Sequence, residues 1–549
     1  MVTMRIYQLK INGSLRGKCK RFNNISIKIN IYIMRHFNKH LINFLFLFVS
    51  SAVIFAQQTL PKNIDQFIEN GRTDWQIPGM AVGVVKDGKV VYAQGFGEKQ
   101  LGSDEKVDAN TVFSIASVSK NITAAALAIL VDRGTITWDD QITHHIPWFQ
   151  MKDAYVTQQI TLRDALTHQT GLGRILGNRL QFMTQSSRDE VLQRVRYMDL
   201  EKPFRSSYVY NNVMYSLAGQ IIEYTDGRTW DDFLQQELFQ PLEMTRTTTT
   251  LAALQKQENI AYPHQEIEGK VVPINRRNWD NAGPAGGVNS TVNDLNQWML
   301  MQLGTSGSLA NKTIISAKQM NEIHKPQVIT PSNNALNPQA SYGLGWNILD
   351  YQGKRVWTHG GATDGFNTFM YLMPELELGI IVVTNTFNNF GSAVAYHLMD
   401  HYIGTSTRDW HQHYLTNYKN RYKQVQQLRD EVHNARNINT QPTLNTTSYT
   451  GNYLSDAYGK IEVKMKDKQL TIRLWNDSDM EGILEHWHYD TFRIVWKNKA
   501  LREEFMQFHL DKDGKIDALN IEFVLRPMLL QVGAYPSNYT HTECFTKEK

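Results

Sequence analysis

The stretch Thr111–Arg133, TVFSIASVSKNITAAALAILVDR, decides how the rest of the chain is interpreted. A short apolar run, Val112–Ala116, reaches Ser117, and a run rich in Ala, Leu and Ile follows at once, which predicts a strand-to-helix junction. Lys120 comes three residues later and would share a helix face with Ser117. A serine beside an amine, at a helix start with unsatisfied backbone N–H groups, can be activated as a nucleophile and its oxyanion held.

The S-x-x-K pattern occurs twice in the chain, so the pattern alone is weak. The second copy is Ser103-Asp104-Glu105-Lys106, in a polar turn with no helical run behind it. Because the chemistry needs a junction between a strand and a helix, we interpret this copy as solvated surface.

Length and composition indicate a globular protein of two domains plus a tail, with 549 residues, 42% of them hydrophobic and 20% charged. The only cysteines, Cys19 and Cys544, lie at opposite ends of the chain, which excludes a disulfide framework and a Cys-rich metal site. The histidine pairs lack three convergent ligands at metal spacing. We therefore expect neither a metal nor a cofactor.

Residues 1–40 hold nine of the 57 basic residues and no acidic one, so the remaining 48 face 53 acidic residues. This balance excludes a basic nucleic-acid footprint in the folded part. Leu41–Ala56 is an uncharged run behind a basic segment, which is typical of a secretory signal peptide, with Met34 as a plausible start. We assign residues 1–56 to this signal and its extension and expect a periplasmic or secreted protein. An uncleaved membrane anchor is the alternative.

The order of predicted elements in residues 57–405 indicates an α+β domain. A hairpin over Met80–Gly95 turns at Asp87-Gly88, mainly helical signals run from Ser117 to about Gln319, and strands return late. The late strands are Tyr342–Leu349, Arg355–His359, Phe366–Met373 and Leu378–Val383, before a helix over Gly391–Ile403. The simplest assembly is one antiparallel sheet built from both ends of the domain and flanked by helices, with the middle as a helical lobe.

The C-terminal part differs in pattern. Residues 406–440 are charged and aromatic with helical spacing, and we interpret them as a helical connector. Residues 441–549 contain short alternating strands separated by Gly and Asp turns, which predicts a small all-β domain, a barrel or a sandwich. The expected strands include Lys460–Lys464, Gln469–Leu474, Phe492–Trp496, Phe505–Leu510 and Ile516–Ile521.

Two further motifs supply groups that an acyl-transfer site needs. Tyr210-Asn211-Asn212 precedes a predicted helix, and a Tyr-x-Asn can provide a proton shuttle and an amide that orients a carbonyl. A tyrosine, with an ordinary pKa of about 10, can act as a base only beside a cation such as Lys120. The same pattern at Tyr418-Lys419-Asn420 lies in the charged connector and is interpreted as a bystander.

His359-Gly360-Gly361 ends the predicted strand that starts at Arg355. Two glycines leave room for a substrate backbone along a strand edge, and the N–H of Ala362 could join that of Ser117 as an oxyanion hole. Taken alone, the motif also fits a bulge or a tight turn.

Together and in this order, the motifs resemble the serine β-lactamase and penicillin-binding family, in particular its class C-like branch of D,D-peptidases, D-aminopeptidases and esterases. The resemblance covers about residues 61–405 and includes DALTHQTGL at Asp164–Leu172 and GPAGGVNSTVNDLNQWM at Gly283–Met299. The C-terminal segment resembles a poorly characterised β-domain that often follows this branch.

The resemblance implies a role for each motif. Ser117 would be acylated, Lys120 would take or relay its proton, and Tyr210 would serve as base or acid at the leaving group. Asn212 would orient the acyl amide. His359 would replace the lysine of the β-lactamase Lys-Thr-Gly motif; a mostly neutral histidine gives a weaker carboxylate grip, which ranks a β-lactamase below a peptidase, amidase or esterase.

We therefore expect an exported serine hydrolase that acts on a small peptide, amide or ester substrate, with its oligomeric state left open. We expect membrane contact only through an uncleaved signal segment. The alternatives are a true β-lactamase and a non-hydrolytic sensor of penicillin or muropeptides.

Overall fold

The structure is a computed structural model that describes residues 59–304, 308–309, 312–331, 339–405, 408–499, 501, 503–524 and 540–548. The expected signal segment, residues 1–56, lies outside these ranges. Within them, no helix combines the length and the apolarity that a bilayer span requires.

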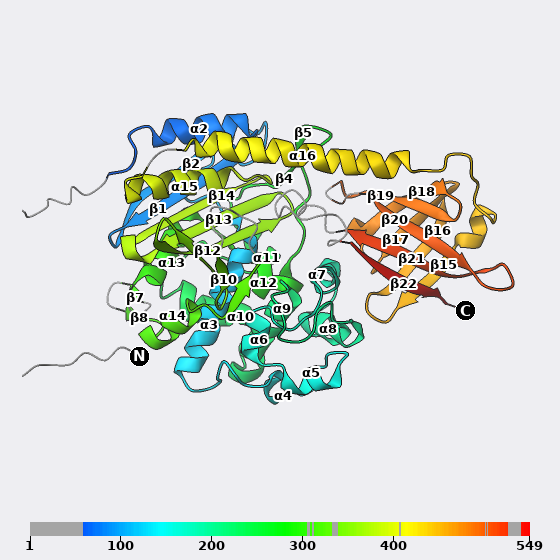
Figure 1. Ribbon diagram of the computed structural model, residues 1–549, viewed down its shortest axis with the longest axis horizontal. Coiled ribbons are helices and arrows are strands. Elements are labelled where there is room, and N and C mark those ends of the chain that lie inside the picture. The colour runs from blue at the N-terminus through cyan, green and yellow to red at the C-terminus, as the bar shows by residue number, and fades with distance from the viewer. Residues whose placement is uncertain are drawn as a thin grey trace, which may run out of the picture. The chain divides into compact units, whose positions relative to one another are not determined.

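One eight-stranded antiparallel sheet organises the first domain (Figure 1), in the order β2-β1-β14-β13-β12-β11-β10-β9. Its strands are β1 (Gly79–Lys86), β2 (Lys89–Gly97), β9 (Val328–Thr330), β10 (Ala340–Tyr342), β11 (Asn347–Tyr351), β12 (Lys354–Thr363), β13 (Phe366–Met373) and β14 (Leu378–Thr384). The N-terminal hairpin joins the late strands where Met80 pairs with Thr384 and Lys86 with Leu378. The predicted assembly of one sheet from both ends of the domain is confirmed.

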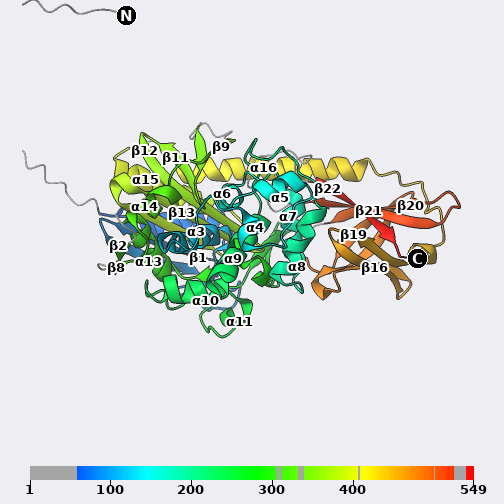
Figure 2. The same ribbon diagram turned by 90° about the horizontal axis from the view of Figure 1, so that it is seen from below.

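Helices cover both faces of this sheet, as Figures 1 and 2 show. On one face lie α2 (Ile64–Asp74), α15 (Phe390–Ile403) and the first turns of α16 (Trp410–Asn434), and on the other lie α3 (Ser119–Asp132) and α13 (Val292–Leu303). Successive residues of β14 alternate between the two cores, with Ile380 and Val382 packed toward α15 and Ile381 and Val383 toward α13. This two-residue period is the signature of a strand buried on both faces.

Between α3 and β9 the chain forms a lobe of short helices. They are α4 (Ile142–His145), α5 (Ala154–Gln159), α6 (Leu162–Leu166), α7 (Arg174–Arg179), α8 (Arg188–Gln193), α9 (Val213–Asp226), α10 (Trp230–Leu234), α11 (Leu251–Leu254), α12 (Gly283–Gly286) and α14 (Ala317–Ile323). Short 3₁₀ turns join them, among them η2 (Leu180–Phe182), η3 (Arg194–Tyr197) and η5 (Asp280–Ala282); a further 3₁₀ turn, η1 (Ala116–Val118), directly precedes α3. Two-stranded pairs complete the lobe: β3 (Phe113–Ser114) with β6 (Asn289–Ser290), β4 (His264–Ile267) with β5 (Lys270–Pro273), and β7 (Ser308–Leu309) with β8 (Lys312–Thr313).

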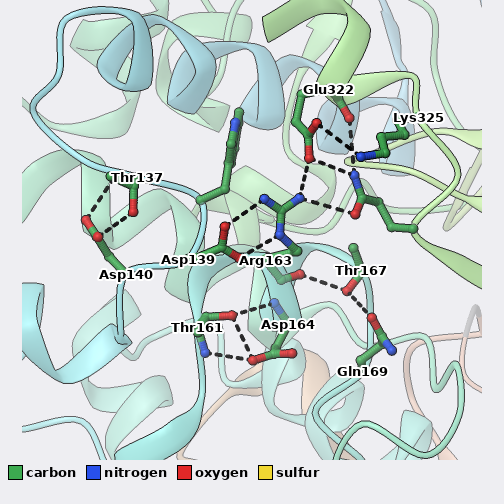
Figure 3. Close-up of polar contacts among 12 residues, drawn as sticks. Thr137, Asp139, Asp140, Thr161, Arg163, Asp164, Thr167, Gln169, Glu322 and Lys325 are labelled. Atoms are coloured by element: carbon green, nitrogen blue, oxygen red, sulfur yellow. Dashed lines mark hydrogen bonds and ion pairs between the residues drawn. The ribbon is translucent and has the colours of Figure 1, made fainter.

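Arg163 of α6 fastens this lobe to the end of the sheet (Figure 3). Its guanidinium donates to Asp139 at 2.7 Å, to Glu322 of α14 at 2.6 Å and to the side chain of Gln327 at 3.2 Å. Its carbonyl accepts a hydrogen bond of 2.8 Å from the hydroxyl of Thr167. The network therefore also anchors the turn that begins at Thr167.

One predicted strand, Tyr342–Leu349, is wrong as a continuous element, because β10 ends at Tyr342 and β11 begins at Asn347. Gly345 between them has φ +82°, and a Cβ there would lie 2.9 Å from the carbonyl oxygen of Lys120. The strand breaks because the chain packs directly against the first turn of α3, a contact only glycine permits.

The C-terminal strands close into an eight-stranded barrel. They are β15 (Gly451–Ser455), β16 (Gly459–Lys466), β17 (Gln469–Leu474), β18 (Glu481–His488), β19 (Thr491–Trp496), β20 (Glu504–Leu510), β21 (Ile516–Val524) and β22 (Thr540–Lys547). The predicted fold class, an α+β domain followed by a small barrel, is confirmed; β18 and β22 were not among the predicted strands. Helix α16, which lies within the predicted connector, packs on α15 through Trp410 and reaches Glu503 beside the barrel through Arg429.

Candidate active site

Ser117 lies in the 3₁₀ turn η1, directly between β3 and α3, as the sequence predicts. The preceding residue, Ala116, has φ +47°, an uncommon backbone conformation for a residue with a Cβ. Ser119 fixes this turn, because its hydroxyl donates to the carbonyl of Ala116 at 2.7 Å and accepts from the N–H of Val288 at 3.0 Å. A strained residue held by its surroundings is a common feature of active sites.

The amine of Lys120 is completely buried beneath Ser117. Its Nζ lies 3.1 Å from Ser117 Oγ, 2.7 Å from Asn212 Oδ1 and 2.7 Å from the carbonyl oxygen of Ala285 in α12. Lys120 thus connects the nucleophile to the Tyr210–Asn212 loop and to the glycine-rich segment that begins at Gly283.

Burial, with the nearby charge of Arg174, lowers the pKa of Lys120 well below its usual value. The three oxygens around Nζ match the three hydrogens of an ammonium, and they also accommodate a neutral amine. A neutral amine has two hydrogens, which match the two carbonyl oxygens of Asn212 and Ala285, and its lone pair is left for the hydroxyl hydrogen of Ser117. This arrangement suits a general base.

Tyr210 completes a triangle around the nucleophile. Its hydroxyl donates to Ser117 Oγ at 2.8 Å, and its ring centre lies 4.7 Å from Lys120 Nζ and 5.1 Å from the guanidinium carbon of Arg174. Burial raises the pKa of Tyr210 to about 12, against the opposing effects of Ser117 and Arg174. The phenol is therefore protonated at neutral pH and suited to donate a proton.

Asn212 is held through three of its polar groups. Beyond the contact with Lys120, its side-chain amide donates to Gln181 Oε1 at 2.8 Å, and its backbone N–H donates to Asn178 Oδ1 at 2.7 Å. Asn178 and Gln181 come from α7 and η2, so this short segment orients the amide that contacts Lys120.

A buried histidine supports the same loop. Nδ1 of His168 accepts from the N–H of Asn211 at 3.1 Å, and His168 has φ +61° at the turn anchored by Thr167. Asn211 is also buried, and its side chain donates to the carbonyl of Gly173 at 2.8 Å. Burial lowers the pKa of His168 well below its usual value, so it acts as a neutral support for Tyr210 and Asn212.

The His359-Gly360-Gly361 motif lies inside β12 and does not end it, which corrects the predicted strand end. Residues 357–363 pair one by one with β13 without a register shift, so the motif is neither a turn nor a bulge. On the other side, β11 pairs with β12 only as far as Thr358. The edge of β12 after His359 is thus left unpaired by β11, which suits the binding of an extended backbone.

The imidazole of His359 is 3% exposed, and both its nitrogens have partners. Nδ1 lies 2.8 Å from the carbonyl oxygen of Gly360, which can only accept, so Nδ1 carries the hydrogen. Nε2 then accepts from the hydroxyl of Tyr342 at 3.1 Å. Burial lowers the pKa of His359 to about 3, so the ring is neutral at neutral pH.

The two glycines and Ala362 sit differently against the nucleophile turn. A Cβ on Gly361 would lie 2.1 Å from the carbonyl oxygen of Ile115, two residues before Ser117, whereas a Cβ on Gly360 would meet only a carbonyl oxygen at 3.8 Å. Gly360 is exposed and Ala362 is half-buried. Gly361 therefore lets the strand touch the turn that presents Ser117, and Gly360 lies on the open edge.

The rejected copies of the motifs lie apart from this arrangement. Lys106 forms an ion pair with Glu98 at 3.1 Å, and Ser103 is exposed. Tyr418 lies in α16, where its hydroxyl donates to Glu266 at 3.2 Å. In the described part of the chain, no three His, Cys, Asp or Glu side chains converge in a way that could hold a metal ion.

Sequence reasoning missed three residues that shape the site: Arg174, Asn178 and Gln181. They lie in α7 and η2, a segment without a marked periodic pattern. His168, in the stretch DALTHQTGL, was interpreted from the sequence as a packing or loop residue, and it packs against the Tyr210–Asn212 loop.

Comparisons with known proteins agree with this geometry. Residues 64–402 match the β-lactamase family, and residues 435–532 match a domain of unknown function (DUF3471). The chain is 29% identical, over 443 residues, to the unguisins hydrolase ungD' of Aspergillus campestris (strain IBT 28561), an alignment covering 76% of this chain and 78% of that protein. It is 25% identical, over 345 residues, to protein flp of Staphylococcus aureus (strain MW2), covering 61% of this chain and 65% of that protein.

Among solved structures, the octameric penicillin-binding protein homologue from Pyrococcus abyssi aligns with a TM-score of 0.56 and 20% identity. The alignment covers 84% of this chain and 97% of that one, and it shows a shared fold. With the family match spanning more than half of its residues, the chain belongs to the β-lactamase family of serine hydrolases.

Proposed function

We propose that this protein is an exported serine hydrolase that forms an acyl-enzyme at Ser117 on a small peptide, amide or ester substrate. The observation that carries the proposal is the position of Lys120 Nζ, which lies 3.1 Å from Ser117 Oγ and 2.7 Å from the carbonyl oxygens of Asn212 and Ala285. The name of one relative, a hydrolase of unguisins, is consistent with hydrolytic activity. Export rests on the sequence pattern of Leu41–Ala56.

The side chains support a balanced reaction. Neutral Lys120 takes the hydroxyl proton of Ser117, whose Oγ attacks the substrate carbonyl carbon. Tyr210, which is protonated, gives its proton to the leaving nitrogen or oxygen and regains the proton held on Lys120. Water then attacks the ester at Ser117, its proton returns through the same groups to Ser117 Oγ, and the acid is released.

The neutral state of His359 bears on the substrate class. A permanent cation at this position of β12 would bind a substrate carboxylate, whereas the imidazole has both nitrogens engaged, by Gly360 and Tyr342. As substrates, we therefore rank peptides, amides and esters above β-lactams, because their binding does not require a cation at this position to hold a carboxylate.

The test is labelling of the full chain with a fluorophosphonate and with a fluorescent penicillin, with Ser117→Ala as the matched control. We expect fluorophosphonate labelling of the wild type and none of the variant. Absence of labelling by both reagents would refute the proposal and favour a non-hydrolytic binder. Rapid turnover of a cephalosporin would reverse the order of substrate classes, and a panel of D-aminoacyl peptides and short acyl esters would then define the substrate.

A further inference from the structure

The segment from α7 to η2 has the active site on one side. Asn178 and Gln181 accept both hydrogen bonds that Asn212 donates, and Gly177 abuts the side chain of Asn211, which would lie 2.5 Å from an added Cβ. The segment also brings Arg174 over the ring of Tyr210. Asn212 in turn contacts Lys120, so the position of this segment is transmitted to the general base.

The same segment has the C-terminal barrel on its other side. Arg179, the last residue of α7, donates to Glu504 of β20 at 2.9 Å, and the two side chains are only 3% and 4% exposed. Thr184, two residues after η2, donates to Asp477 at 2.5 Å. Further along, the guanidinium of Arg194 lies 3.3 Å from the carbonyl oxygen of Asp456.

The segment depends on such contacts because it has little stability of its own. Helix α7 has six residues and η2 has three, and no side chain caps the start of α7 at Gly173. Isolated helices of this length do not form stably in water, so their position is set by tertiary contacts. A buried ion pair constrains geometry strongly, because either charge left alone would be costly.

We infer that the barrel is a positioning element for catalysis: Glu504, with Asp477, holds α7 and η2 so that Asn178 and Gln181 orient Asn212 against Lys120. The inference rests on the proposed function and assigns a role to the domain of unknown function. Glu504 does not touch the reacting atoms, so it is a positioning residue that acts through Asn212.

A double-mutant cycle tests this role in the full chain. The readout is the second-order rate constant of fluorophosphonate labelling at Ser117, for Glu504→Gln, Asn212→Ala and the two combined. We expect Glu504→Gln to lower the rate about tenfold in the wild-type background and less than about twofold in the Asn212→Ala background. A merely structural role would lower the rate by the same factor in both backgrounds, which would overturn the inference.

The matched control is Asp490→Asn, the same carboxyl-to-amide change at a barrel residue that bonds Tyr449 and Thr443. It should leave the labelling rate within about twofold; an equal loss would overturn the inference. If Glu504→Gln does not fold, Thr184→Val replaces it, with a threefold loss expected that again vanishes in the Asn212→Ala background. Absence of labelling in the wild type would overturn the proposed function as well, whereas equal effects in both backgrounds would overturn this inference alone.

Discussion

Lys120 and His359 are both buried nitrogen bases of the active site, and burial lowers the pKa of each, yet the structure uses them differently. Lys120 Nζ lies 2.7 Å from the carbonyl oxygens of Asn212 and Ala285 and 3.1 Å from Ser117 Oγ. His359 spends its hydrogen on Gly360 and its lone pair on Tyr342. Burial therefore lowers the pKa of both groups, and their partners differ: Lys120 contacts Ser117 Oγ, whereas the two nitrogens of His359 contact Gly360 and Tyr342.

The same comparison separates catalysis from substrate choice. Around Lys120 the site is buried, and the polar groups there form hydrogen bonds with one another. The edge of β12 after His359 offers backbone and small residues, with Gly360 exposed and no pairing from β11 beyond Thr358. The predictions below test this division, starting with the largest expected effect.

Removing the amine should have the largest effect. Lys120→Ala should lower the rate of acylation at Ser117 about a thousandfold, because a positioned general base contributes roughly 10²- to 10⁴-fold. The rate is measured as the burst of an activated ester or as fluorophosphonate labelling. Lys106→Ala, in the second S-x-x-K copy, is the control and should acylate like the wild type; normal acylation by Lys120→Ala would show that the base is another group.

The contact between β12 and the nucleophile turn should come next. Gly361→Ala would place a Cβ 2.1 Å from the carbonyl oxygen of Ile115 and should lower the free energy of unfolding by about 1–3 kcal/mol, with a matching loss of acylation. Gly360→Ala, one residue earlier, has room for its Cβ and should be nearly neutral in stability. Thermal unfolding of the two variants measures the difference, and equal behaviour of both would contradict the described approach of strand and turn.

The local parts of the site were predictable from sequence because their groups are close along the chain. Ser117 and Lys120 are three residues apart at a strand-to-helix junction, so their proximity follows from helix spacing. Spacing does not show that Tyr210, three residues before α9, contacts Ser117, 93 residues away in the sequence. The sheet was predictable for a similar reason, since its strands are strongly apolar and separated by turn residues.

The remaining features depend on contacts that spacing does not encode. The neutral state of His359 depends on Tyr342, 17 residues away, and on burial by the whole domain. The break at Gly345 depends on the approach of α3, and the roles of Asn178 and Gln181 depend on where a short, weakly patterned helix packs. Strand β18 was missed because polar and aromatic residues interrupt its alternation, and β22 was missed because its sequence, THTECFTK, is mostly polar.

The pH dependence should separate the two bases next. As the pH falls through the lowered pKa of Lys120, the amine takes up a proton and can no longer accept one from Ser117, so kcat/KM should fall toward acid. His359, with its pKa lowered to about 3, stays neutral across the range from pH 5 to 9 and should add no limb there. The acid limb should therefore persist at the same pH in His359→Gln, measured with a neutral ester. A limb that disappears in this variant would show that His359 titrates in the working range.

The smallest effect should come from Tyr342→Phe, which leaves Nε2 of His359 without its donor while keeping the ring. An unsatisfied buried acceptor costs about 1 kcal/mol or somewhat more, so the variant should unfold at a lower temperature, with acylation reduced only a few-fold. Tyr208→Phe is the matched control, because Tyr208 packs on His168 and Tyr342, as the ring of Tyr342 does on His168, but its hydroxyl makes no hydrogen bond with any described residue. The carbonyl of Gly360 can still accept from Nδ1 in Tyr342→Phe, so NMR of the imidazole nitrogens should show Nδ1 protonation in this variant, as in the wild type and the control. Loss of Nδ1 protonation in Tyr342→Phe would contradict this assignment and would mean that the hydroxyl of Tyr342, and not the carbonyl of Gly360, fixes the tautomer of the buried ring.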